Sequence, residues 1–458
     1  MFLLGAMGGA SWADDGTALI GRVSAVAGAA QYRSVAGDWS AAQNNEPVAA
    51  GTGLRTAAGA ETDIHMPGAR VALAPASELQ VLRFDGVMLQ IALSAGRTGI
   101  HLDAGGVAKT VEIDLPQGGV WLTAPGDYDI YAGDGHAPAA VQVFAGAAQL
   151  GGGLDNRSVT AASPDWFSDW WRSQGDTADR SDPRPWPQIP GFAALADAGT
   201  WKLDPKLGNV WFPSDVAADW APYRDGAWRY VAPWGWTWID NAPWGFAPSH
   251  FGRWARLDDR WAWVPGERLA VADYRPAIVA FLGTAGIGLS RPGDIGAMPA
   301  IAWFPLAPGE TIGDADGDYR NRRFATAVPR DAFASGQPVA AAQVSDIPAQ
   351  RFADAPVILD ALSIPPARTA SAATKKPLVV AAAADNSAAS SDSPETTRQP
   401  FFVTLRDAPP RAPARQIVRE IRRRVHVAIA LHSRAAASTS AFHPAHNRQH
   451  FAAARRGA

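Results

Sequence analysis

Hydrophobic and polar positions alternate in short runs along the first third of the chain. Turn residues (Gly, Pro, Asn and Asp) separate the runs roughly every 8–12 residues, a spacing typical of short strands. Alternation with a period of two places successive side chains on opposite faces of a strand. Residues 17–150 are therefore predicted to form an antiparallel β-sandwich or roll. Typical runs are Val87-Met88-Leu89-Gln90-Ile91, Val111-Glu112-Ile113 and Val141-Gln142-Val143-Phe144.

The segment 190–350 is rich in Trp and contains an internal repeat. Gly226-Ala227-Trp228 aligns with Gly252-Arg253-Trp254 at an offset of 26 residues. Trp236-Thr237-Trp238 aligns with Trp261-Ala262-Trp263 at an offset of 25. Each unit contains a short aromatic strand, a Gly turn and a second aromatic strand. We predict β-hairpins in which each Trp-x-Trp pair places both indoles on one face, so the whole protein is expected to be all-β.

Residues 151–189 are expected to be a linker with one short helix. Trp166, Phe167, Trp170 and Trp171 share one face of such a helix, which is expected to clamp one domain onto the next. The Pro-rich run 182–187 then extends the chain.

Residues 356–458 are predicted to be a disordered tail, because Ala, Ser, Pro and Thr dominate and burial could not offset the entropy of ordering. Residues 401–458 hold eleven Arg against Asp407 and Glu420, so their formal charge is 11 − 2 = +9. The whole chain carries −3, which leaves −3 − 9 = −12 on the rest. The tail is expected to touch anionic surfaces, with 415–434 either a solvated basic segment or a basic amphipathic helix.

The beginning of the chain has the layout of a signal peptide, predicted over residues 1–13. Apolar residues run from Phe2 to Ala10, and Ser11-Trp12-Ala13 fits the small-x-small cleavage rule. The usual preceding basic residues are missing, so this start is expected to lie inside a longer signal peptide. We expect an exported protein, periplasmic or extracellular. No transmembrane anchor is expected, since no later stretch reaches the ~18 apolar residues of a membrane span.

Several short segments spread over residues 17–150 carry a family resemblance. They include Gly21-Arg22-Val23, Asn45-Glu46-Pro47-Val48, Leu54-Arg55-Thr56, Gly96-Arg97 and Leu122-Thr123-Ala124-Pro125-Gly126. With these segments, residues 17–150 resemble a FecR-like domain, a periplasmic β-module named for an iron-transport regulator. The resemblance is not taken to imply sigma-factor signalling, because the anti-sigma segment and membrane helix that precede the domain in those regulators have no counterpart in this sequence.

The second module contains a further set of characteristic segments. They include Gly208-Asn209-Val210-Trp211-Phe212-Pro213, Trp220-Ala221-Pro222, the stretch 233–248 (PWGWTWIDNAPWGFAP), Ser249-His250-Phe251-Gly252-Arg253-Trp254 and Trp261-Ala262-Trp263-Val264-Pro265-Gly266. With these segments, the module resembles a Trp-rich bacterial domain of unknown function that often follows FecR-like domains. The resemblance implies no activity.

The clustered indoles support two interpretations. They can replace an aliphatic core in a thin hairpin domain, because each aromatic side chain buries roughly 150–250 Å². They can also form an exposed platform that binds a ligand, since an apolar surface patch usually marks a binding site. Both can hold if the hairpins bury one face and expose the other. The candidate platform consists of Trp234, Trp236, Trp244, His250, Arg253 and Trp254.

The candidate residues for chemistry are few. His250 as a general base would need a nucleophile or an acid nearby, so a hydrogen bond to neighbouring backbone is the expected role. The acidic loop 314–318 lacks the rest of a calcium loop. His443, His446 and His450 could gather a metal weakly, without fixed geometry. The chain has no Cys, which excludes disulfides and thiolate metal sites. We expect no catalytic residue, no cofactor and no resident metal.

We therefore expect a non-catalytic envelope protein that binds or scaffolds a polymer or protein partner through aromatic β-surfaces. Envelope polysaccharide, peptidoglycan or another envelope protein would be the partner. No nucleic acid is expected as a partner, because the net charge is −3 and charged residues make up 19% of the chain. The alternative is a hydrolase of glycan or peptidoglycan, which needs two carboxylates facing each other across a cleft.

Overall fold

The computed structural model describes residues 19–35, 37–104, 106, 110–154, 158–160, 162–173, 189–267, 273–283, 288–289, 298–311, 318–343, 349–358 and 364–366. All of them belong to one of the two units of the chain, residues 1–384. The predicted signal peptide, the acidic loop positions 314–317, the Arg-rich segment 401–458 and its His residues lie outside the described residues.

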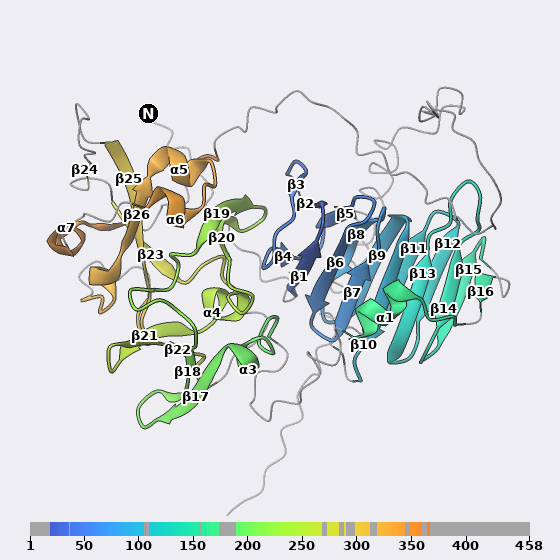
Figure 1. Cartoon of the computed structure of the whole chain (residues 1–458), viewed down its shortest axis with the longest axis horizontal. Coiled ribbons are helices and arrows are strands. Elements are labelled where there is room, and N and C mark those ends of the chain that lie inside the picture. The colour runs from blue at the N-terminus through green and yellow to red at the C-terminus, as the bar shows by residue number, and fades with distance from the viewer. Residues whose placement is uncertain are drawn as a thin grey trace, which may run out of the picture. The chain divides into compact units, whose positions relative to one another are not determined.

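The first module is a sandwich of two eight-stranded sheets (Figure 1). The strand order is β16-β14-β13-β10-β7-β6-β1-β4 in the first sheet and β15-β12-β11-β9-β8-β5-β2-β3 in the second. Neighbours are antiparallel except β9–β11 and β14–β16, which are parallel. The strands are β1 (Gly21–Ala27), β2 (Ala30–Arg33), β3 (Ser40–Ala41), β4 (Pro47–Val48), β5 (Gly53–Thr56), β6 (Glu61–Met66), β7 (Ala69–Leu73), β8 (Glu78–Phe84), β9 (Met88–Ala95), β10 (Arg97–Leu102), β11 (Thr110–Leu115), β12 (Gly118–Leu122), β13 (Gly126–Tyr131), β14 (Ala140–Val143), β15 (Ala148–Gly152) and β16 (Val159–Thr160).

The alternation of apolar and polar residues in the sequence corresponds to the alternation of inner and outer faces along the strands of the sandwich. In the first sheet, Val23 pairs with Ile64, which pairs with Val71, and Val71 pairs with Ile100. All four side chains have no exposed surface, whereas their polar neighbours along each strand point to the outer face. The prediction of an all-β fold is confirmed.

Helix α1 (Trp166–Ser173) packs on the outer face of the first sheet. Phe167 and Trp171 are buried against the sheet, while Trp166 is 60% exposed. The ring of Trp171 occupies the space where a Cβ on Gly99 would lie, so this approach requires glycine. The helix itself was predictable, but its expected position between the two domains is wrong, because its apolar face covers the sandwich.

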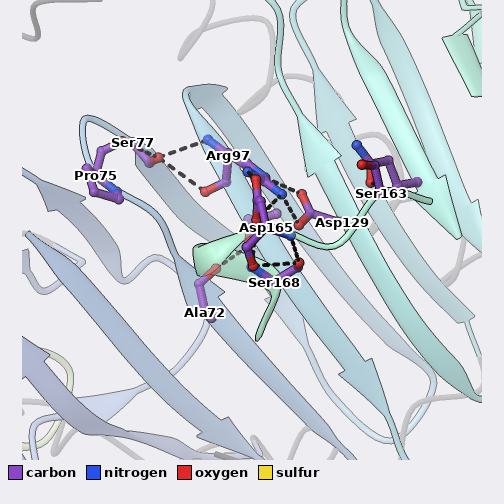
Figure 2. Close-up of polar contacts among 10 residues, drawn as sticks. Ala72, Pro75, Ser77, Arg97, Asp129, Ser163, Asp165 and Ser168 are labelled. Carbon is purple, nitrogen blue, oxygen red and sulfur yellow. Dashed lines mark hydrogen bonds and ion pairs between the residues drawn. The ribbon is translucent and has the colours of Figure 1, made fainter. Parts of the chain in front are cut away.

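Arg97 fixes the start of this helix to the sheet, as Figure 2 shows. Its Nε and Nη2 donate to the two carboxylate oxygens of Asp129, at 2.6 and 2.7 Å. Its Nη1 donates to Asp165 at 2.5 Å. Asp165 also caps the helix, since its Oδ1 accepts from the Ser168 N–H at 2.9 Å and the Ser168 hydroxyl accepts from the Asp165 N–H at 2.8 Å.

In the second module, the described residues form three small sheets and several short helices (Figure 1). The sheets are ordered β17-β18-β22-β21, β19-β20 and β24-β25-β23-β27, with β26 paired to β25. The elements are α3 (Leu195–Ala198), β17 (Gly199–Asp204), β18 (Gly208–Pro213), β19 (Gly226–Val231), β20 (Gly235–Asp240), α4 (Phe246–His250), β21 (Arg253–Leu257), β22 (Arg260–Val264), β23 (Val279–Leu282), β24 (Gly288–Leu289), β25 (Met298–Pro305), η3 (Arg322–Phe324), β26 (Thr326–Pro329), α5 (Arg330–Ala334), α6 (Val339–Ala342), α7 (Ala349–Asp354) and β27 (Val357–Ile358).

The internal repeat corresponds to two hairpins, β19–β20 and β21–β22. Trp228 lies opposite Trp238 in the first, and Trp254 lies opposite Trp263 in the second. The β21–β22 turn consists of Asp258 and Asp259, both with positive φ, as a two-residue hairpin turn with the right twist requires. The hairpin prediction is confirmed. The short helix α4 between the hairpins was not predicted.

Regular structure continues past residue 356, where the sequence predicted the start of the tail. Strand β27 adds to the edge of β23, with Leu282 opposite Val357. Ile364 is buried, and its carbonyl accepts a hydrogen bond from the indole of Trp236 at 2.8 Å. These few residues pair with the edge of a sheet and pack in the core. The composition of the segment does not reveal these contacts.

Candidate functional site

The structure places the predicted platform residues in and around the Trp hairpins. They are Trp234, Trp236, Trp244, His250, Arg253 and Trp254. Trp236 and Trp254 are 2% exposed, Trp244 is 9% exposed and His250 has no exposed surface. The other two are half-buried. A landing surface needs open ring faces. The four buried side chains therefore form core rather than a platform, because segments before and after the hairpins cover the face that the sequence left open. Trp220 contacts both Trp244 and Trp254, and Phe333 of α5 contacts Trp236.

Aromatic rings from distant strands and from helix α5 close this core in perpendicular and tilted pairs. The ring of Trp228 lies 5.6 Å from Trp238 across the hairpin, 5.4 Å from Trp303 and 5.5 Å from Phe333, measured between centroids. A second group forms around Trp244, whose ring lies 5.0 Å from that of Trp211. Tilted and perpendicular aromatic pairs of this kind add about 0.5–1.5 kcal/mol each beyond the area they bury.

Backbone carbonyls satisfy several of the buried indole N–H groups. This pairing is needed because an unpaired buried donor costs about 1–3 kcal/mol. The pairs are Trp211 with Leu195 (3.0 Å), Trp254 with Pro248 (3.0 Å), Trp263 with Phe251 (2.8 Å) and Trp303 with Tyr223 (3.1 Å).

His250 is the last residue of helix α4. Its Nδ1 is 2.8 Å from the carbonyl oxygen of Arg275, and its ring packs beside Phe246 and Tyr274. Burial lowers the pKa of His250 to about 4, so the imidazole is neutral near pH 7. The expected backbone hydrogen bond is confirmed.

Asp240 ends strand β20 as a buried carboxylate. Its oxygens accept hydrogen bonds from the Trp238 indole and from the Ala242 N–H, both at 2.9 Å. Burial raises the pKa of Asp240 to about 6. These bonds shape the turn 240–243, whose carbonyl groups point to the first module.

A buried polar seam joins the two modules at this turn. Asn45 donates to the carbonyls of Asp240 and Ala242, at 2.9 and 2.8 Å, and accepts from Arg22 at 2.9 Å. Arg22 also donates to the Pro243 carbonyl at 3.4 Å. Asn45 has φ +66°, a conformation that Asn adopts more easily than most residues.

An ion pair extends the seam. The Arg229 guanidinium of β19 donates to the Glu46 carboxylate and to the Ala41 carbonyl. Burial raises the pKa of Glu46 to about 7, against the opposing effect of Arg229. Apolar side chains continue across the same boundary, since one cluster of buried residues includes Ile20 and Val48 of the sandwich together with Trp244 and Phe246 of the second module.

Sequence reasoning selected Arg22, Asn45 and Glu46 only as carriers of a family resemblance. Arg22 belongs to the Gly-Arg-Val segment, and Asn45 and Glu46 open the Asn-Glu-Pro-Val segment. Their partners in the second module lie far along the chain, since Asp240 is 195 residues beyond Asn45. A single sequence contains no signal that pairs residues at this separation.

Metal binding and glycan hydrolysis each require a particular arrangement of side chains. Within those ranges, no group of three or more His, Cys, Asp or Glu is placed to hold a metal ion. A cavity of about 190 Å³ opens at one end of the sandwich, beside the turn 67–68 and the turn 123–125, and Asp103 is the acidic residue in its lining. A glycan hydrolase needs two carboxyl groups about 5–10 Å apart across the substrate, and this cavity lining supplies one.

Comparison with known proteins identifies part of the second module. Residues 192–310 match a family of unknown function (DUF6600). The resemblance of the second module to a domain of unknown function is thereby confirmed at this level. The comparisons with curated proteins and with solved structures give no match. Among the described residues, no helix is both long and apolar enough to span a membrane.

Proposed function

We propose that this protein is a non-catalytic, exported envelope protein that binds or scaffolds a cell-envelope polymer or another envelope protein. The observation that carries the proposal is the buried seam of Arg22, Asn45, Glu46 and Arg229 with the turn 240–243. Together with the shared apolar cluster, it fixes one β-module on the other. Rigid elements held in this way present a surface with little entropic cost on binding.

The burial of the titratable groups supports a role without chemistry. His250 makes a hydrogen bond with a backbone carbonyl. Asp240 accepts a hydrogen bond from an indole N–H, and Glu46 accepts one from the Arg229 guanidinium. A general base must come within hydrogen-bond reach of a substrate. Each of these three groups is buried and makes a structural contact, which for His250 involves Nδ1, while Nε2 has no hydrogen-bond partner among the described residues.

The proposal includes a FecR-like identity for the first module and export to the periplasm or beyond. The first rests on the residue segments that carry the resemblance, of which Gly21-Arg22-Val23 and Asn45-Glu46-Pro47-Val48 also supply seam residues. The second rests on the signal-like layout of residues 1–13.

Retention on insoluble envelope material tests the function. The full chain is incubated with purified peptidoglycan and with insoluble polysaccharides at low and high salt, and bound protein and soluble sugar are both measured. We expect retention at both salt concentrations and no release of sugar. Because high salt screens exposed charge pairs, retention that survives it does not come from nonspecific electrostatic attraction. Release of soluble sugar would establish the hydrolase instead. Absence of retention, together with absence of a co-purifying envelope protein, would contradict the proposal.

A further inference from the structure

Two indoles lie on the outer face of the second sandwich sheet, each directly over glycine. A Cβ on Gly53 would come within 3.1 Å of the Trp39 ring. Cβ atoms on Gly119 and Gly151 would come within 3.0 and 2.8 Å of the Trp121 ring. Both rings are partly exposed. The sheet thus builds two similar aromatic positions, one near each end.

The chain's own arginines occupy the first position. The guanidinium carbons of Arg33 and Arg55 lie 4.5 and 4.4 Å from the centroid of the Trp39 ring. Gln31 holds Arg55 in place, because its side-chain oxygen accepts from Arg55 Nε at 2.6 Å. Stacking of a guanidinium on an indole is favourable, and this geometry shows that the outer face accommodates it.

Two carboxyl groups, and no arginine, lie beside the second indole, Trp121, among the described residues. Glu112 lies opposite Trp121 in the β11–β12 ladder and accepts a hydrogen bond from its indole N–H. Asp114, two residues along the same face, accepts from Gln90 Nε2 at 2.9 Å. Burial and the neighbouring Asp114 raise the pKa of Glu112, as expected for two carboxyl groups in contact. In the described part of the chain, neither carboxylate forms a salt bridge with Arg, Lys or His.

We propose that Trp121, Glu112 and Asp114 form a docking site for an arginine side chain on an extended segment of a protein partner. The guanidinium would stack on the indole, as Arg33 and Arg55 do on Trp39, and would donate charge-assisted hydrogen bonds to the paired carboxylates. The charge of the site is complementary to this occupant. The inference rests on the proposed function, and it gives the chemistry of the protein partner.

Peptide binding to the full chain tests the site. A fluorescent peptide of alternating Gly and Arg is titrated by anisotropy beside a Gly–Lys peptide of the same length. We expect Glu112→Gln with Asp114→Asn to weaken binding of the Arg peptide about ten-fold or more, because charge-assisted bonds are lost. Trp121→Leu is expected to weaken the Arg peptide more than the Lys peptide. Glu78→Gln, on β8 of the same sheet, is the matched control and should leave binding unchanged.

Several outcomes would overturn the site. If the wild type and all variants bound the Arg peptide with equal affinity, binding would come from general attraction to the acidic part of the chain. If the Arg and Lys peptides bound with equal affinity, a guanidinium stacked on Trp121 would be excluded. Loss of polysaccharide retention in Trp121→Leu, with no effect on peptide binding, would assign the surface to sugars. Cross-links from a photoreactive group at position 149 to residues 401–458, in place of the added peptide, would exclude a partner. Retention of the Glu112→Gln, Asp114→Asn variant on insoluble envelope material is measured separately. Because that retention does not depend on peptide binding, the arginine site can fail while the proposed function stands, and the reverse.

Discussion

At the scale of single residues, the seam depends on a few polar side chains that are buried because each has a matching partner. Asn45 is the central one, since it donates to two carbonyls of the second module and accepts from Arg22. Buried polar groups cost free energy when one partner is removed, more than the intact bond contributes. The seam should therefore be sensitive to small changes.

Asn45→Ala is expected to lower the free energy of unfolding by about 2–4 kcal/mol, from the lost hydrogen bonds and the unpaired groups left behind. Asn45→Gly should be less damaging by up to about 1 kcal/mol, because glycine adopts positive φ without strain. Urea-induced unfolding measures both. Asn44→Ala is the control, since the Asn44 side-chain oxygen has no hydrogen-bond partner. Equal effects at positions 44 and 45 would contradict the role of Asn45.

Glu46 should make stability depend on pH. Folding raises its pKa from 4.5 to about 7, so the folded state holds a proton that the unfolded chain releases. The resulting stabilisation is full below about pH 4.5 and is lost as the pH rises through 7. When the pH falls from 8 to 4.5, the free energy of unfolding of the wild type should therefore rise by about 1–3 kcal/mol relative to that of Glu46→Gln. Urea unfolding of both proteins at stepped pH measures this difference, in which the contributions of Asp240 and His250 cancel. Parallel pH profiles would refute it.

At the scale of elements, the sequence predicts strands and hairpins well, because alternation and turn residues are local. The Trp-x-Trp segments place both indoles on one face as expected, and Asp258 and Asp259 form the turn between two of these strands. The covering of that face was not predictable. Trp238 contacts Trp303 of β25, and Trp236 contacts Phe333 of α5, more than sixty residues further along the chain. Local periodicity identifies an apolar face but not its partner.

Helix α1 gives a test at this scale. Gly99→Ala would place a methyl group where the Trp171 ring lies. We expect α1 to separate from the sheet, with a loss of about 1–3 kcal/mol, the usual cost of overpacking. Hydrogen exchange of residues 166–173 should become faster, while exchange of the second module stays unchanged. Gly86→Ala is the control, because a Cβ there meets no atom within 4 Å. Unchanged exchange in Gly99→Ala would contradict the packing of α1.

At the scale of the whole molecule, the two modules share one apolar cluster and a polar seam. The sequence indicated two β-modules joined by a linker but not their contact, because the contact joins residues far apart in the chain. It also left open whether the indoles were core or platform. Segments on both sides of the hairpins in the chain cover the indoles and make them core, such as Trp220 before them and Phe333 after them.

Calorimetric unfolding of the full chain tests the central claim most directly, namely that the seam and the shared core unite both modules. A single transition is predicted, with equal calorimetric and van't Hoff enthalpies, and Asn45→Gly should lower its midpoint. Two separate transitions, with neither midpoint shifted by Asn45→Gly, would contradict the claim.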